Sequence, residues 1–84
     1  MKPVTIYTRF LCPYCVRAKA LLAARGVPFA EHDVSFDRAR RAEMLARAGG
    51  RTSVPQIFIG DTHIGGCDEL VALEKAGKLE AMLA

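Results

Sequence analysis

Two cysteines three positions apart, Cys12 and Cys15, enclose a proline and a tyrosine in the stretch CPYC. Such a pair of thiols could hold a metal ion, form a structural disulfide, or exchange electrons as a dithiol. A third cysteine, Cys67, lies far along the chain, where we expect a small buried residue. Because the spacing of the pair is compatible with all three chemistries, the surrounding sequence has to distinguish between them.

The sequence gives little support to a metal site or a structural disulfide. A closed zinc site requires four ligands, and neither a second CxxC motif nor a histidine pair at ligand spacing is present. His32 falls in a predicted strand and His63 at a hairpin edge, where we expect surface residues. A permanent bridge within CPYC would close only a small loop and so constrain the unfolded chain little. We therefore expect no metal and favour redox exchange.

The residues around Cys12 favour an ionised thiol. Cys12 falls where a predicted strand gives way to a helix, and Pro13 suits the first helical position. Free backbone N–H groups and the positive end of the helix dipole would stabilise a thiolate there, and Arg9 adds a nearby cation. Cys15, one turn further along, would be more sheltered. The pattern predicts an attacking thiolate at Cys12 and a resolving thiol at Cys15.

Length and composition predict one globular domain over residues 1–84. The chain has no long apolar run, and its first residues are too polar for a signal sequence, so we expect a cytoplasmic protein without membrane contact. The net charge is +3, and five arginines lie between Arg38 and Arg51. No aromatic residues interleave with them, which favours the solvated face of a helix and excludes nucleic acid as the expected partner.

The apolar pattern predicts the order of secondary-structure elements. Alternation predicts strands over 3–8, 28–34 and 54–59, and Gly60-Asp61 predicts a hairpin to a return strand. Helices are predicted over 13–25, 37–48 and 67–76, with a last turn after Gly77. The residues expected to face the core are Val16, Ala20 and Ala23, flanked by Leu21 and Leu22, in the first helix, and Ala42, Met44 or Leu45, and Ala48 in the second.

This order predicts an α/β fold. The first strand–helix–strand crossover implies a parallel pair of strands, and the hairpin implies an antiparallel pair. A four-stranded mixed sheet flanked by three or four helices, with helices on both faces, follows from these connections. We therefore predict a thioredoxin-like fold.

Three stretches of the chain resemble the signature motifs of dithiol glutaredoxins, most closely the small bacterial members: CPYC at 12–15, SVPQIFI at 53–59 and GGCDEL at 65–70. The resemblance implies a glutathione-dependent thiol–disulfide oxidoreductase that reduces glutathione mixed disulfides and protein disulfides through Cys12 and Cys15. It implies glutathione as the reducing co-substrate and no permanently bound cofactor. The implied partners are glutathionylated or disulfide-containing proteins, with ribonucleotide reductase one candidate, and we expect a monomer.

The resemblance also implies a glutathione site. Arg9 stands where the family commonly has a lysine that binds a carboxylate of glutathione, and Ser53 keeps the hydroxyl of a more frequent threonine. The backbone of Val54, before a cis proline, would pair with the peptide groups of glutathione. Arg51 is a further candidate for the glycyl carboxylate. The implied glutathione-binding residues are Arg9, Tyr14, Ser53, Val54, Pro55, Gly66, Cys67 and Asp68, the last three forming a clamp for the γ-glutamyl end.

Three alternative functions remain open at this stage. A redoxin fed by thioredoxin reductase would share the fold and the CxxC motif, although Arg9 and the GGCD stretch argue against it. A dimer bridged by a [2Fe–2S] cluster is disfavoured because relatives of that kind usually carry a single active-site cysteine. A pure interaction module would have no use for an activated thiol. The role of Cys67 is likewise open.

Overall fold

A computed structural model describes all residues from 1 to 84 and contains four strands and four helices in the predicted order. Most elements begin or end within a few residues of their predicted bounds. The elements are β1 (Val4–Thr8), α1 (Pro13–Ala24), β2 (Ala30–Asp33), α2 (Arg38–Arg47), β3 (Gln56–Ile59), β4 (Thr62–Gly65), α3 (Cys67–Lys75) and α4 (Leu79–Leu83).

The four strands form one mixed sheet in the order β2-β1-β3-β4. Strand β1 runs parallel to β2, which follows it through α1, whereas β3 is antiparallel to both β1 and β4. The hairpin between β3 and β4 turns at Gly60, whose φ of 58° lies in the left-handed region that glycine tolerates. The predicted topology is therefore confirmed.

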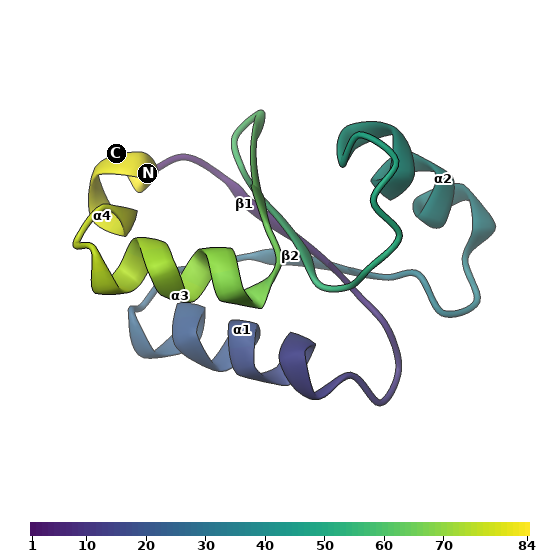
Figure 1. Ribbon diagram of the computed structural model, residues 1–84, viewed down its shortest axis with the longest axis horizontal. Coiled ribbons are helices and arrows are strands. Elements are labelled where there is room, and N and C mark those ends of the chain that lie inside the picture. Colours follow the sequence, from purple (N-terminus) through teal and green to yellow (C-terminus); the bar gives the residue numbers. More distant parts are fainter.

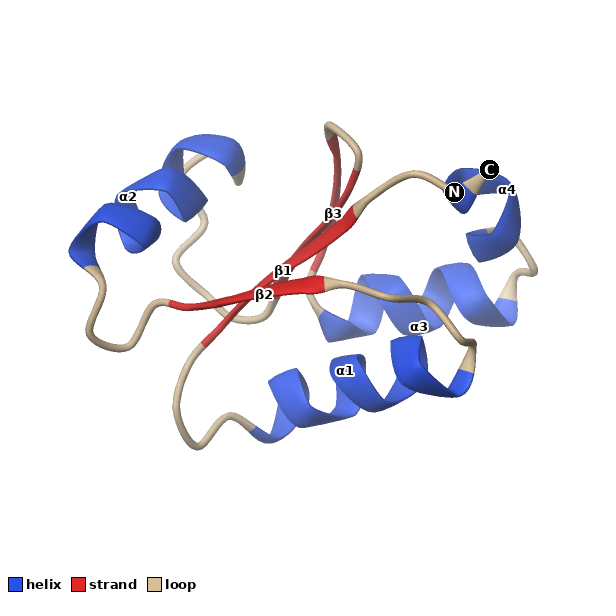
Figure 2. Cartoon of the chain, turned by 180° about the vertical axis from the view of Figure 1, so that it is seen from behind, coloured by secondary structure: helices blue, strands red, loops and turns tan.

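The helices cover the two faces of the sheet unequally. Helices α1, α3 and α4 lie on one side and α2 lies alone on the other (Figure 1, Figure 2). Because successive side chains of a strand point to opposite faces, β1 directs Ile6 toward the first group of helices and Tyr7 toward α2. Strand β3 divides Ile57 and Phe58 in the same way. Two separate cores result, one on each face.

The predicted inward faces of the helices are wrong in part. In α1, Val16 is 63% exposed, and Ala20 and Ala23 are also exposed. The helix is rich in alanine and leucine on every side, so the apolar pattern did not select one face. In α2, Met44 and Ala48 are buried as predicted, whereas Ala42 is exposed. The residues that α1 buries are Cys15, Ala18 and Leu22.

Candidate active site

Cys12 is the N-cap residue of α1, immediately before Pro13 at the first helical position. Its backbone is extended, with φ −110° and ψ 104°, and its sulfur accepts a hydrogen bond from the Cys15 N–H at 3.1 Å. An N-cap side chain that accepts from a helix N–H is held against the positive end of the helix dipole. The structure thus places Cys12 at the predicted position, at the start of α1 and beside a helix N–H.

Cys15 differs from Cys12 in burial and in protonation. The Cys15 side chain is buried, with 2% of its surface exposed, whereas Cys12 is half-buried. Burial, followed by the hydrogen bond with Cys12, raises the pKa of Cys15 to about 12. The thiol of Cys15 is therefore protonated at neutral pH. Both cysteines are free thiols, so the structure represents the reduced dithiol with one accessible and one sheltered sulfur.

A cleft of about 150 Å³ opens between the loop that precedes β3 and the N-terminus of α3. The Val54–Pro55 peptide bond in its wall is cis, and the Val54 carbonyl oxygen lies 3.9 Å from the Cys12 sulfur. The cleft therefore begins beside the accessible thiol. The residues that line it are Tyr14, Arg51, Ser53, Val54, Pro55, Gly66, Cys67, Asp68 and Glu69.

The cleft brings together every glutathione-binding residue that the family resemblance implied except Arg9. The Arg9 side chain is exposed on the loop between β1 and Cys12 and does not line the cleft. Arg51, the further candidate, does line it. Cys67 is buried, with 3% of its surface exposed, and burial raises the pKa of its thiol.

The N-terminus of α3 forms the second wall of the cleft. Gly66 is the N-cap residue, and the Glu69 carboxylate accepts hydrogen bonds from the Gly66 N–H and the Arg51 guanidinium, each at 3.1 Å. The Gly66 N–H and Arg51 together lower the pKa of Glu69, against an opposing effect of burial. Asp68 lies exposed in the first turn. The sequence indicates Glu69 as an acidic residue in the first turn of this helix but not as a residue of the cleft, although a glutamate three residues after an N-cap is a recognised capping signal.

Two polar side chains, those of Gln56 and His63, are hydrogen-bonded to each other beside Ser53. The Gln56 side chain is fully buried, and its Nε2 donates to the Ser53 carbonyl oxygen at 2.9 Å and to the Ser53 hydroxyl at 3.2 Å. Its Oε1 lies 2.6 Å from Nε2 of His63. His63, predicted as a surface residue rather than a ligand, is half-buried, and its ring stacks on Phe58 with centroids 4.9 Å apart. Gln56 was detectable as the one polar residue within a buried strand.

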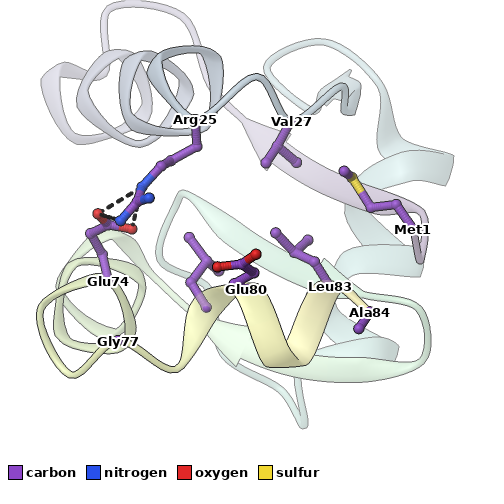
Figure 3. A pocket seen from close by; sticks show the side chains of 9 residues that line it. Met1, Arg25, Val27, Glu74, Gly77, Glu80, Leu83 and Ala84 are labelled. Atoms are coloured by element: carbon purple, nitrogen blue, oxygen red, sulfur yellow. Dashed lines mark hydrogen bonds and ion pairs between the residues drawn. The ribbon is translucent and has the colours of Figure 1, made fainter.

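A larger cavity, of about 490 Å³, lies away from the thiols, beside α4 and the chain ends (Figure 3). An ion pair between Arg25 and Glu74 forms part of its wall and joins the end of α1 to α3 (Figure 3). The remainder of its lining includes Val27, Leu79 and Leu83. No cysteine or histidine lines this cavity, whereas the smaller cleft includes Val54, whose carbonyl oxygen lies 3.9 Å from the Cys12 sulfur.

No three histidine, cysteine, aspartate or glutamate side chains come close enough together to hold a metal ion. None of the helices combines the length and the apolar character needed to cross a bilayer. The arginine-rich segment is also not simply solvated, since the Arg47 guanidinium lies 4.1 Å above the Phe58 ring and donates to the Tyr7 hydroxyl.

The mixed sheet, with an asymmetric dithiol at the start of its first helix, defines a thiol–disulfide oxidoreductase of the thioredoxin-like fold. Comparison with known proteins agrees: the glutaredoxin family model matches residues 4–64. A glutaredoxin of Pseudomonas aeruginosa is 58% identical over 84 residues, covering 100% of this chain and 99% of the relative. The chain belongs to the glutaredoxin family.

Solved structures support the same assignment. The solution structure of glutaredoxin from Brucella melitensis is 58% identical, with a TM-score of 0.85 over 99% of this chain and 89% of that one. A crystal structure of a buckwheat glutaredoxin–glutathione complex is 33% identical, with a TM-score of 0.86 over 98% of this chain and 76% of that one. The thioredoxin-like fold predicted from the sequence is thus confirmed.

Proposed function

We propose that this protein reduces glutathione mixed disulfides and protein disulfides through Cys12 and Cys15, with glutathione as the reducing co-substrate and no permanently bound cofactor. The observation that carries the proposal is the position of the Cys12 sulfur. It accepts a helix N–H and lies 3.9 Å from the Val54 carbonyl oxygen at the edge of an open cleft. The buckwheat relative that shares the fold was crystallised with glutathione.

Removal of glutathione from a protein requires Cys12 alone. The Cys12 thiolate attacks the glutathione sulfur of the mixed disulfide, a bond forms between these two sulfurs, and the substrate leaves as a thiolate that takes up a proton. A second glutathione thiolate then attacks the glutathione sulfur bound to Cys12. This step releases oxidised glutathione and restores the Cys12 thiolate, so the net reaction converts the mixed disulfide and one glutathione thiol into the substrate thiol and oxidised glutathione.

Reduction of a protein disulfide requires both cysteines. The Cys12 thiolate attacks one sulfur of the substrate, and the other leaves as a thiolate. Cys15 then gives up its proton and attacks the Cys12 sulfur, which frees the second substrate thiol and leaves a Cys12–Cys15 disulfide. Two molecules of glutathione reduce that disulfide again. The burial that keeps Cys15 protonated at neutral pH ensures that Cys12 reacts first.

The cleft offers suitable groups for glutathione along its length. We assign the Val54 backbone to the peptide groups of the ligand and Tyr14 to its flank, beside Pro55. The first N–H groups of α3, at Cys67 and Asp68, would take the γ-glutamyl carboxylate beside Gly66, and the Asp68 carboxylate would take its ammonium. The remaining groups that we assign to ligand binding are the Ser53 hydroxyl and the guanidinium groups of Arg9 and Arg51.

The setting of this activity follows from the chemistry. We propose that residues 1–84 act as one glutaredoxin domain and as a monomer, because a single chain supplies both thiols and the cleft. A dithiol regenerated by glutathione requires a reduced glutathione pool, which places the protein in the cytoplasm. Glutathionylated proteins and enzymes that recycle through a dithiol, such as ribonucleotide reductase, are the substrates that we propose.

The β-hydroxyethyl disulfide assay, coupled to glutathione reductase, tests the proposal. Cys12→Ser should abolish turnover, whereas Cys15→Ser should retain reduction of glutathione mixed disulfides and lose reduction of protein disulfides. Both variants replace a cysteine sulfur with a serine oxygen, one helical turn apart, so each variant is a control for the other. Activity that persists without Cys12 would refute its role. Faster reduction by thioredoxin reductase than by glutathione would favour the alternative redoxin.

A further inference from the structure

Gln56 is a buried amide whose hydrogen-bonding groups are all used inside the protein. Its Nε2 donates to Ser53, both to the carbonyl oxygen and to the hydroxyl oxygen. Its Oε1 faces Nε2 of His63 at 2.6 Å. No buried side-chain nitrogen or oxygen in the chain lacks a hydrogen-bond partner, so this pair forms a complete network.

The Ser53 carbonyl oxygen determines which group donates and which accepts in every hydrogen bond of this network. The Ser53 carbonyl oxygen can only accept, so the amide of Gln56 must turn its NH₂ group toward Ser53. Its Oε1 must then face His63, whose Nε2 must carry a hydrogen in order to donate. The same NH₂ group donates to the Ser53 hydroxyl oxygen, which accepts through a lone pair.

This arrangement leaves the hydrogen of the Ser53 hydroxyl free. Ser53 is exposed and lines the cleft, and its hydroxyl donates to no group within the chain. A hydroxyl has a single hydrogen to donate, and here that hydrogen is directed away from Gln56. The cleft therefore presents a donor at Ser53, which suits a carbonyl or carboxylate oxygen of a bound ligand.

We propose that Gln56 and His63 are positioning residues that set the Ser53 hydroxyl as a hydrogen-bond donor to glutathione. The inference rests on the proposed function, because it concerns the same cleft. At one end of the network, the stack on Phe58 fixes the His63 ring. The other end is Ser53, which lies in the loop that also carries Val54. Gln56 does not line the cleft and reaches it only through Ser53.

A double-mutant cycle on ligand affinity tests the proposal. The probe is S-methylglutathione, which carries the groups of glutathione without a reactive thiol, and its dissociation constant is measured by NMR titration of the reduced protein. Ser53→Ala should weaken binding about threefold to tenfold, the worth of one net hydrogen bond. At a pH at which its carboxyl is ionised, Gln56→Glu offers only acceptors to Ser53, draws the hydroxyl hydrogen inward, and should weaken binding to the same extent. The double variant should bind no worse than either single variant.

Controls separate this role from a general effect on folding. Leu79→Ala truncates a buried residue of α4, far from the cleft, and should lower the unfolding temperature without changing affinity for S-methylglutathione. Gln56→Met removes the donor without supplying an acceptor, and its affinity should fall between those of the wild type and Gln56→Glu. It also replaces Gln56→Glu in the cycle if the buried carboxylate prevents folding.

A measurement on the wild type alone tests the network without any variant. The ¹⁵N shifts of the neutral His63 ring should show the hydrogen on Nε2, and a hydrogen on Nδ1 would overturn the inference. Additive losses from Gln56→Glu and Ser53→Ala would also overturn it while leaving the proposed function intact. A wild type that fails to bind S-methylglutathione would overturn both, so the two failures are distinguishable.

Discussion

Treatment of the reduced protein with iodoacetamide at pH 7 should modify Cys12 and spare Cys15. Only the thiolate reacts with this reagent. With a pKa of about 12 in place of an ordinary 9.0, Cys15 has a thiolate fraction at pH 7 about a thousandfold below that of an unperturbed thiol. Burial of the sulfur, which is the main cause of the shift, adds steric protection to this factor.

The assay is mass spectrometry of alkylated peptides over time, with free cysteine in the same tube as the reference. Cys15 should react at least about a thousandfold more slowly than the reference at pH 7, and its rate should go on rising above pH 9, where the rate of the reference levels off. Cys12→Ser should leave Cys15 slow, because burial outranks the hydrogen bond from Cys12 among the causes. Modification of Cys15 within tenfold of the reference would show that the sulfur is not buried as described.

Three further predictions concern stability, each measured by urea unfolding. Leu22→Ala empties a fully buried site in α1 and should lower the free energy of unfolding by about 2–5 kcal/mol, and a loss below about 1 kcal/mol would contradict the burial. Tyr7→Phe removes hydrogen bonds to two charged side chains of α2 and should cost about 1 kcal/mol, so an unchanged midpoint would be unexpected. Burial acts to raise the pKa of Glu31, but hydrogen bonds from Thr8 and Lys19 prevail and lower it. Glu31 therefore stabilises the fold above its ordinary pKa of 4.5, and the advantage of the wild type over Glu31→Gln should disappear as the pH falls below that value.

The order of elements and the position of the thiols were predictable because they depend on short-range signals. Pro13 after Cys12 marks the start of a helix, and Gly60 marks a hairpin, whatever the rest of the chain does. The cleft was predictable only through the family resemblance, since its two walls come from distant segments of the chain. Its residues carry no periodicity that would have placed Ser53 opposite Gly66.

The features that sequence analysis missed depend on packing between elements. An alanine-rich helix offers several faces of equal apolarity, so the burial of Ala18 rather than Val16 is decided by how α1 lies on the sheet. His63 was judged by its place at a hairpin edge, yet the aromatic ring of Phe58 on the neighbouring strand shields it. The partner of a buried amide such as Gln56 is likewise fixed only by the three-dimensional structure.

The two chain ends meet beside α4, at the opposite end of the molecule from the start of α1 (Figure 1). The Lys2 N–H donates to the Leu83 carbonyl oxygen at 2.7 Å. A fluorescent reporter or a surface tether joined to either end would therefore project away from the thiols and leave their approach unobstructed. A short glycine-rich linker could also join the ends, so that the chain could be reopened at an exposed loop as a circular permutant.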